Sequence, residues 1–150
     1  MSTLFAFLHH LAAFTLVACL AIEFVLIRGE LGREGARRLQ RVDMLFGISS
    51  GVLLLVGLLR VFYFEKGAEY YFHSWPFLAK LVLFLAVGLL SIPPTLEFLS
   101  WNRLLREGRV PALSDERRRR LRRFMHLELM AIVLILACAA LMARGIGHFG

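Results

Sequence analysis

The sequence has few of the residues that form covalent or zinc-based cross-links. It contains only two cysteines, Cys19 and Cys138, and each lies inside an apolar block. A structural zinc site needs about four closely spaced ligands, and no such group surrounds either cysteine in the sequence. We therefore interpret both cysteines as small buried hydrophobic residues.

Long polar segments are also missing, which excludes an ordinary soluble domain. Hydrophobic residues make up 59% of the 150 residues, and the mean hydropathy is +0.69. Soluble chains average nearer ~45–50% apolar residues. Charged segments separate the apolar residues into four blocks, which cover residues 3–27, 44–64, 76–96 and 124–143.

These four blocks predict an all-α fold, an integral membrane four-helix bundle that forms a single domain over residues 1–150. Each block has roughly 20 residues or more, the length that crosses about 30 Å of hydrocarbon as an α-helix. Isolated strands are excluded because their backbone groups would stay unpaired in lipid. The first block lacks a basic start and is too long for a cleaved signal peptide, so we interpret it as a span.

The distribution of positive charge predicts the orientation of the helices. Residues 28–43 hold five arginines and residues 97–123 hold nine, whereas segment 65–75 has only Lys66 as a basic residue. Positively charged short loops stay in the cytoplasm. We expect an up-down-up-down bundle in a bacterial inner membrane, with both termini outside. The net charge of +7 then points to anionic membrane lipids as partners and not to nucleic acid.

Two local signals bear on the helix ends. Ser114, followed by two acidic residues, predicts the start of a helix that continues through the arginines 117–120 into the fourth span. These arginines are expected to form a solvated flank, or else a lipid or nucleotide site. Pro93 and Pro94 either kink the third helix or end it early.

Ionisable side chains within a membrane are costly and usually face the bundle interior. At about 100° per residue, small or polar residues of every block fall in a stripe along one side of its helix. By depth, the ionisable residues fall into an outer and an inner layer. The outer layer holds His9, His10, Arg60, Lys80 and Arg144, with His73 and His148 in flanking segments. The inner layer holds Glu23, Glu97, His126 and Glu128.

The outer layer has the residue types of a haem b site. Haem needs an axial imidazole, a cationic edge for its two propionates and an apolar slot. His9 or His10 would ligate the iron, with His73 or His148 as a candidate on the opposite face, and the three cations of the layer would bind the propionates. We prefer His9, which shares its helical phase with Glu23. The alternative is that the cations extend to lipid headgroups and the histidines are plain interface residues.

The inner layer also allows two interpretations. Glu23 and His126 would form a metal-binding or proton-relay pair. Alternatively, the glutamates of this layer bind the neighbouring arginines, for example Glu128 with Arg123. His9 lies roughly 9 Å below the outer edge and His126 roughly 3 Å above the inner one, which leaves about 18 Å between them. We therefore do not expect His9 and His126 to ligate one iron atom.

Four segments together resemble an uncharacterised family of small bacterial four-span membrane proteins, a domain of unknown function. They are LHHLAAFTLVACLAIEFVLIR, GLLRVFYFEKGAEYY, FLAKLVLFLAVGLLSIPPTLEFL and ALMARGIG. The resemblance covers nearly the whole chain and implies a four-span fold.

The chain is more distantly similar to the HemJ and CopD groups. HemJ proteins are small haem b membrane proteins linked to protoporphyrinogen IX oxidation, and CopD proteins are linked to copper. The HemJ-like features are a histidine early in the first span (His9 or His10), an AKL motif with Lys80 in the third, and His126 near the start of the fourth. This similarity implies tetrapyrrole binding.

We therefore predict a small inner-membrane haem b redox protein, a membrane oxidoreductase that takes electrons from a quinol or a tetrapyrrole. A protein that binds or transports a metal or small solute through Glu23 and His126 is the alternative. A non-catalytic assembly subunit is the second alternative. Gly47 and Gly51 form a small-xxx-small pair, which suits packing within the bundle as well as a homo-oligomer.

Overall fold

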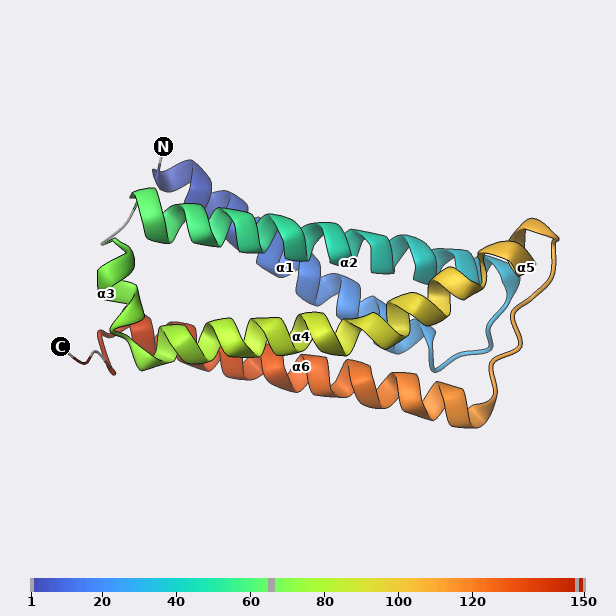
Figure 1. Cartoon of the computed structure of the whole chain (residues 1–150). Coiled ribbons are helices and arrows are strands. Elements are labelled where there is room, and N and C mark those ends of the chain that lie inside the picture. The colour runs from blue at the N-terminus through green and yellow to red at the C-terminus, as the bar shows by residue number, and fades with distance from the viewer. Residues whose placement is uncertain (1, 65–66, 148, 150) are drawn as a thin grey trace.

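The computed structural model of the chain describes residues 2–64, 67–147 and 149 (Figure 1). Within these residues there is no strand, and four helices are long and apolar enough to cross a membrane. They are α1 (Ser2–Leu26), α2 (Arg33–Leu59), α4 (Trp75–Ser100) and α6 (Asp115–Ala143). The predicted all-α fold with four membrane-spanning helices is confirmed.

The four long helices form two antiparallel pairs. Helix α1 packs along α2, and α4 packs along α6, so that Figure 1 shows two layers of helices. Both chain termini lie at one end of the bundle together with the short helix α3 (Ala68–Phe72), and we call this the terminal end. The opposite end holds the connection between α1 and α2. It also holds the connection between α4 and α6, which includes the short helix α5 (Asn102–Arg106). We call it the arginine-rich end.

Helix α6 begins where the sequence predicts. The Ser114 hydroxyl oxygen accepts a hydrogen bond of 3.3 Å from the backbone N–H of Arg117, which satisfies one of the free donors of the first turn. Asp115 and Glu116 add negative charge at this helix start, where it is stabilising. The helix then runs through the arginine cluster to Ala143, so it extends well beyond the apolar block 124–143.

Two consecutive prolines in the second half of α4 do not end the helix. Pro93 and Pro94 both lie inside it, and it continues to Ser100. The alternative that the pair ends the third helix early is therefore wrong. Because proline has no amide hydrogen, each ring leaves a carbonyl one turn earlier without its usual donor. Pro94 is among the most deeply buried residues of the chain, so its ring packs inside the bundle.

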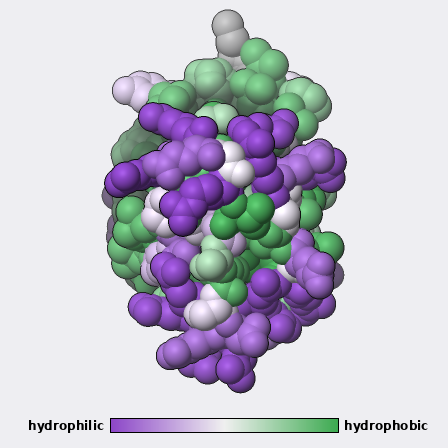
Figure 2. Space-filling view, turned by 90° about the vertical axis from the view of Figure 1, so that its right-hand side faces the viewer, coloured by the Kyte–Doolittle hydropathy of each residue, from purple (hydrophilic) through white to green (hydrophobic). Residues whose placement is uncertain are grey.

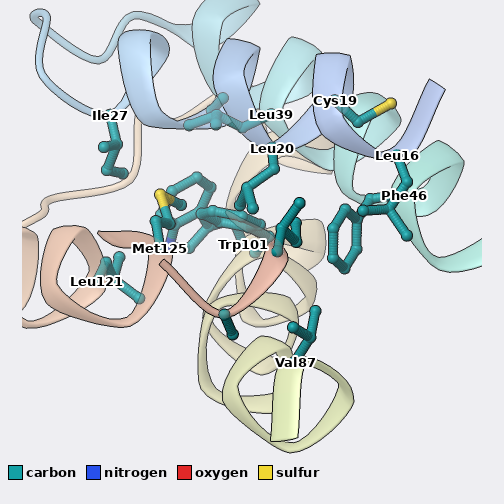
Figure 3. Packing of buried hydrophobic residues seen from close by; sticks show 14 of the residues in the cluster. Leu16, Cys19, Leu20, Ile27, Leu39, Phe46, Val87, Trp101, Leu121 and Met125 are labelled. Atoms are coloured by element: carbon teal, nitrogen blue, oxygen red, sulfur yellow. The ribbon is translucent and has the colours of Figure 1, made fainter. Parts of the chain in front are cut away.

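The hydrophobic core lies toward the arginine-rich end. All four long helices contribute buried side chains to it, and α5 and the residue before it add two more (Figure 3). Five large core side chains are almost completely removed from solvent: Leu20, Ile27, Leu39, Phe98 and Met125. The two helix pairs are thus held together mainly in this half of the bundle.

The outward faces of the helices are apolar as well. Phe14 is 75% exposed, and Val25, Leu55, Val82 and Leu136 are also exposed. Soluble proteins rarely expose apolar surface of this extent. The exposed side chains match helices whose outer faces contact lipid hydrocarbon.

Figure 2 looks onto the arginine-rich end, where hydrophilic side chains surround a hydrophobic centre. Arg118 donates hydrogen bonds from Nη1 to the backbone oxygens of Ile27, at 3.1 Å, and of Gly29. These carbonyls follow the last turn of α1, where the helix offers them no donor. Arg118 therefore fastens α6 to the end of α1, so the cluster of arginines is not uniformly a solvated flank.

Candidate functional site

A cavity of about 500 Å³ lies between the two helix pairs near the terminal end. This size is within the ~300–1,000 Å³ range of small-molecule sites. All four long helices line it, together with α3 and the π-helical turn η1 (Arg60–Phe64). Most of its wall is aliphatic or aromatic. Its polar side chains are His9, His10, Arg60, Tyr70, Tyr71, Ser74 and Lys80.

Four of the predicted outer-layer residues meet in this cavity. His9 and His10 come from α1, Arg60 from η1 and Lys80 from α4. Three separate elements therefore bring two imidazoles and two cations to one apolar space. This agrees with the expectation that their helical stripes face the interior.

The other outer-layer residues are placed differently. Arg144 caps the end of α6 and is exposed, and it does not line the cavity although both of its neighbours do. His73 is exposed, and its Nδ1 lies 2.7 Å from the backbone oxygen of Glu69. His148 lies outside the described residues. The structure thus does not bring Arg144 or His73 to the predicted site.

The two neighbouring histidines have different surroundings. His10 is exposed, and its Nδ1 lies 2.6 Å from the backbone oxygen of Ala6 in the preceding turn. His9 is half-buried and packs against α2 at Gly57, where an added Cβ would lie 3.3 Å from His9 Cε1. Gly57 therefore makes room for the His9 ring between α1 and α2. Of the two rings, His9 is the one held in a defined place by packing.

Arg60 opens a π-helical turn rather than continuing a regular α-helix. The turn η1 follows α2 directly, and its Val61 is buried against the cavity. Such turns add a residue to the helical repeat and recur at functional sites. Helical phase at about 100° per residue therefore cannot place residues beyond Arg60.

The segment after α6 closes the terminal end beside the cavity. The backbone oxygen of Gly147 accepts a hydrogen bond of 3.1 Å from the N–H of Trp75, and Phe149 donates its N–H to the oxygen of His73 at 2.8 Å. Gly147 has a φ of 85°, which favours glycine. These bonds hold the segment against the start of α4, next to Ile146, which lines the cavity.

The predicted inner-layer residues separate into two groups. Glu97 accepts hydrogen bonds from Arg117 Nη2 at 2.9 Å and from Trp101 Nε1 at 3.1 Å, as the arginine-binding interpretation expects. Glu23 and Glu128 behave differently, since each is only 2% exposed. In the described part of the chain neither forms an ion pair, and Oε1 of each has no hydrogen-bond partner.

His126 does not lie with Glu23 in the interior. It is exposed on α6, and its ring centroid is 6.4 Å from that of Phe24. The groups that act electrostatically on Glu23 are Asp43 and Glu128. Among the described residues, no group of three or more His, Cys, Asp or Glu side chains could hold a metal ion.

Comparison with known families agrees with the four-helix membrane fold. Residues 1–147 match the family model described as Predicted membrane protein (DUF2214). The chain belongs to the DUF2214 family. The family description names no activity. No curated protein and no solved structure matches the chain, and the similarity to the HemJ and CopD groups has no counterpart in these comparisons.

One buried ionisable residue of this DUF2214 protein, Asp43, lies outside both predicted layers. It is 8% exposed, and its Oδ1 accepts a hydrogen bond of 2.8 Å from Thr95. Asp43 directly precedes the apolar block that begins at residue 44, so the charge pattern places it in a loop. A signal was present, because buried Leu39 and Phe46 lie one turn on either side of it and extend the apolar stripe across it.

Proposed function

We propose that the protein is a haem b-binding membrane redox protein and that the cavity at the terminal end is its haem site. The observation that supports this proposal is that His9, Arg60 and Lys80 line a single, largely apolar cavity of about 500 Å³. An imidazole, two cations and apolar walls are the groups that a haem with two propionates requires.

The residues of the cavity suit the parts of haem separately. Arg60 and Lys80 would bind the propionates through charge-assisted hydrogen bonds. The aliphatic and aromatic side chains around them, among them Leu53, Phe84 and Ile135, would cover the macrocycle and exclude water. Bound haem would supply one-electron chemistry in this apolar setting.

One histidine rather than two would ligate the iron. His9 and His10 are the only histidines in the described lining of the cavity. Because adjacent helical positions differ by about 100°, the two rings cannot both face one point in the cavity. We assign the ligand role to His9, whose ring is held against Gly57.

A solute-binding protein is the second candidate function. Tyr70, Tyr71 and Ser74 bring three further hydroxyl groups to the cavity lining. Haem has no need of so many hydrogen-bonding groups, whereas a quinol or another polar aromatic solute could use them. This alternative keeps the same cavity and changes only its occupant.

The test is the absorption spectrum of full-length protein purified in detergent from cells supplied with a haem precursor. We expect a Soret band and a haem b pyridine adduct for the wild type. The band should be lost in His9→Ala and retained in His126→Ala, whose side chain lies far from the cavity and is exposed. A colourless wild-type protein overturns haem binding and favours the solute-binding candidate.

A further inference from the structure

We propose that Glu23, Asp43 and Glu128 form a proton-binding site inside the membrane-spanning bundle, in which at least one carboxyl group carries an exchangeable proton. The site is separate from the cavity at the terminal end. It goes beyond the proposed haem function and does not depend on what occupies that cavity.

All four long helices contribute to this site. Glu23 lies on α1, Asp43 on α2 and Glu128 on α6, and Thr95 of α4 donates its hydroxyl hydrogen bond of 2.8 Å to Asp43. Asp43 acts electrostatically on both glutamates, and Glu128 acts on Glu23. Three acidic groups from three helices thus share one buried region.

The two glutamates leave buried oxygen atoms unsatisfied. Glu23 and Glu128 are each only 2% exposed, and Oε1 of each has no hydrogen-bond partner in the described part of the chain. Buried polar groups in proteins are otherwise almost always hydrogen-bonded. These two carboxyl oxygens are therefore open to a bound proton.

An apolar layer separates the carboxyl groups from the arginines. One helical turn further toward the arginine-rich end, the same helices place fully buried Ile27, Leu39, Phe98 and Met125. Figure 3 shows Ile27, Leu39 and Met125 directed into the space between the helices. A turn spans about 5.4 Å, so this layer lies between the carboxyl groups and the arginines of α6. Arg41 of α2 lies nearer the level of the site, and it is exposed.

Two arginines near this layer have other partners. Arg117 binds Glu97, and Arg118 binds the backbone oxygens after α1. The other titratable group that interacts with Glu23 is the thiol of Cys19, one turn earlier on α1. In the described part of the chain, the groups that interact with one another at the site are therefore three carboxyls, a thiol and the Thr95 hydroxyl.

A proton is the ligand that fits this chemistry. An ionised carboxylate in an apolar interior is costly without a cation, and repulsion between neighbouring carboxylates adds to the cost. A bound proton removes one charge and provides an O–H donor for a neighbouring oxygen. A metal ion fits less well, since the described side chains contain no group of three or more ligands arranged to hold one. Intramembrane carboxyl groups of this kind serve proton transfer.

The test uses dicyclohexylcarbodiimide, an apolar reagent that modifies protonated carboxyl groups in apolar surroundings. Full-length protein in lipid nanodiscs would be treated over a range of pH, and the modified residues identified by peptide mass spectrometry. We expect modification at one or more of the three buried carboxyls, decreasing as the pH rises. Exposed Glu30 and Glu69 are internal controls and should stay unmodified.

Two outcomes of this labelling overturn the proposal. The first is modification of the buried carboxyls no greater than that of Glu30 and Glu69. The second is protection of the buried carboxyls by added Na⁺, Ca²⁺ or Zn²⁺ at constant pH, which would identify a metal cation as the ligand.

A second measurement uses the wild-type protein, so it does not require that any variant folds. The infrared spectrum of the wild type should contain the carbonyl stretch of a protonated carboxylic acid, and this band should shift in D₂O. Absence of such a band near neutral pH, where exposed carboxyl groups are ionised, overturns the proposal. Where Glu23→Gln and Glu128→Gln fold, one or both should lose intensity in this band, whereas Glu30→Gln should not.

Discussion

The hydroxyl of Thr95 donates a hydrogen bond of 2.8 Å to Oδ1 of Asp43, and this bond joins one helix pair to the other. One turn away, Gln40 Nε2 donates to the backbone oxygen of Phe98 at 2.6 Å and to Oδ1 of Asn102 at 3.0 Å. The bonds to Thr95 and Phe98 run between α2 and α4, and the bond to Asn102 reaches α5, all in the half of the bundle that holds the core. The opposite half, at the terminal end, contains the cavity.

Replacing Thr95 by valine tests how much the bond to Asp43 contributes to stability. Valine keeps the shape of the side chain but leaves a buried carboxyl oxygen without its donor. We expect a loss of about 1–3 kcal/mol in the free energy of unfolding, measured as a lower melting temperature in detergent. Thr95→Ser keeps the hydroxyl and should lose less. Equal melting temperatures for the Thr95→Val and Thr95→Ser proteins would contradict this role.

Replacing Gly147 by alanine should loosen the segment that closes the terminal end. An added Cβ would lie 2.6 Å from Trp75 Cδ1 and 2.9 Å from Pro76 Cδ, and the backbone φ of 85° disfavours alanine. We expect a lower melting temperature and a changed fluorescence of Trp75.

Gly145 is the matched control for this substitution. Its φ is 67°, but an added Cβ would meet nothing within 4 Å. Gly145→Ala should therefore cost only the backbone strain, about 1–2 kcal/mol. If Gly145→Ala and Gly147→Ala had the same effects, contact of the added Cβ with Trp75 would not be the reason for glycine at position 147.

Replacing both Arg60 and Lys80 by glutamine tests the proposed propionate site. These are the only Arg or Lys side chains in the described lining of the cavity. A hydrogen bond to a charged group contributes about 1.5–3 kcal/mol, so each loss should weaken haem binding by about ten-fold or more. The measurement is haem retention in detergent. Arg144→Gln should retain haem like the wild type, because Arg144 lies outside the lining. If Arg144→Gln lost more haem than the Arg60 and Lys80 double variant, this propionate site would be excluded.

Membrane orientation can be tested by cysteine labelling in intact cells. Gly35→Cys and Ala112→Cys place thiols at the arginine-rich end, which the charge pattern predicts to be cytoplasmic. A membrane-impermeant maleimide added from outside should not label them. Glu69→Cys on α3, at the terminal end, should be labelled. Native Cys19 and Cys138 are buried and give little background. Labelling at residue 35 or 112 would show that the orientation is opposite to the predicted one.

Several features of the site could be predicted from single residues. The depth of His9, Arg60 and Lys80 along their helices follows from residue number, because an α-helix rises 1.5 Å per residue. Their meeting at one cavity could therefore be anticipated. Arg144 has a suitable depth but lies at the cap of α6, where the helix ends and phase no longer describes its direction.

The inner residues show where such reasoning fails. Glu23 and His126 have similar depth, yet Glu23 is buried and His126 is exposed. The rotation of α6 about its axis decides this difference, and it depends on packing against α4. The apolar blocks do not predict a buried Asp43, because α2 begins at Arg33, well before the block at residue 44, and Asp43 packs against Thr95 in the interior.

The four apolar blocks are enough to predict the number of spans, their approximate limits and the helical class, because crossing hydrocarbon requires long apolar segments with every backbone group paired. Which polar groups meet depends on how the helices pack. The tertiary structure sets the rotation of each helix, the π-helical turn at Arg60 and the contacts of Asp43 and Glu128. The physical reason is that hydrophobicity acts on whole segments, whereas the neighbours of a side chain depend on how four helices pack together.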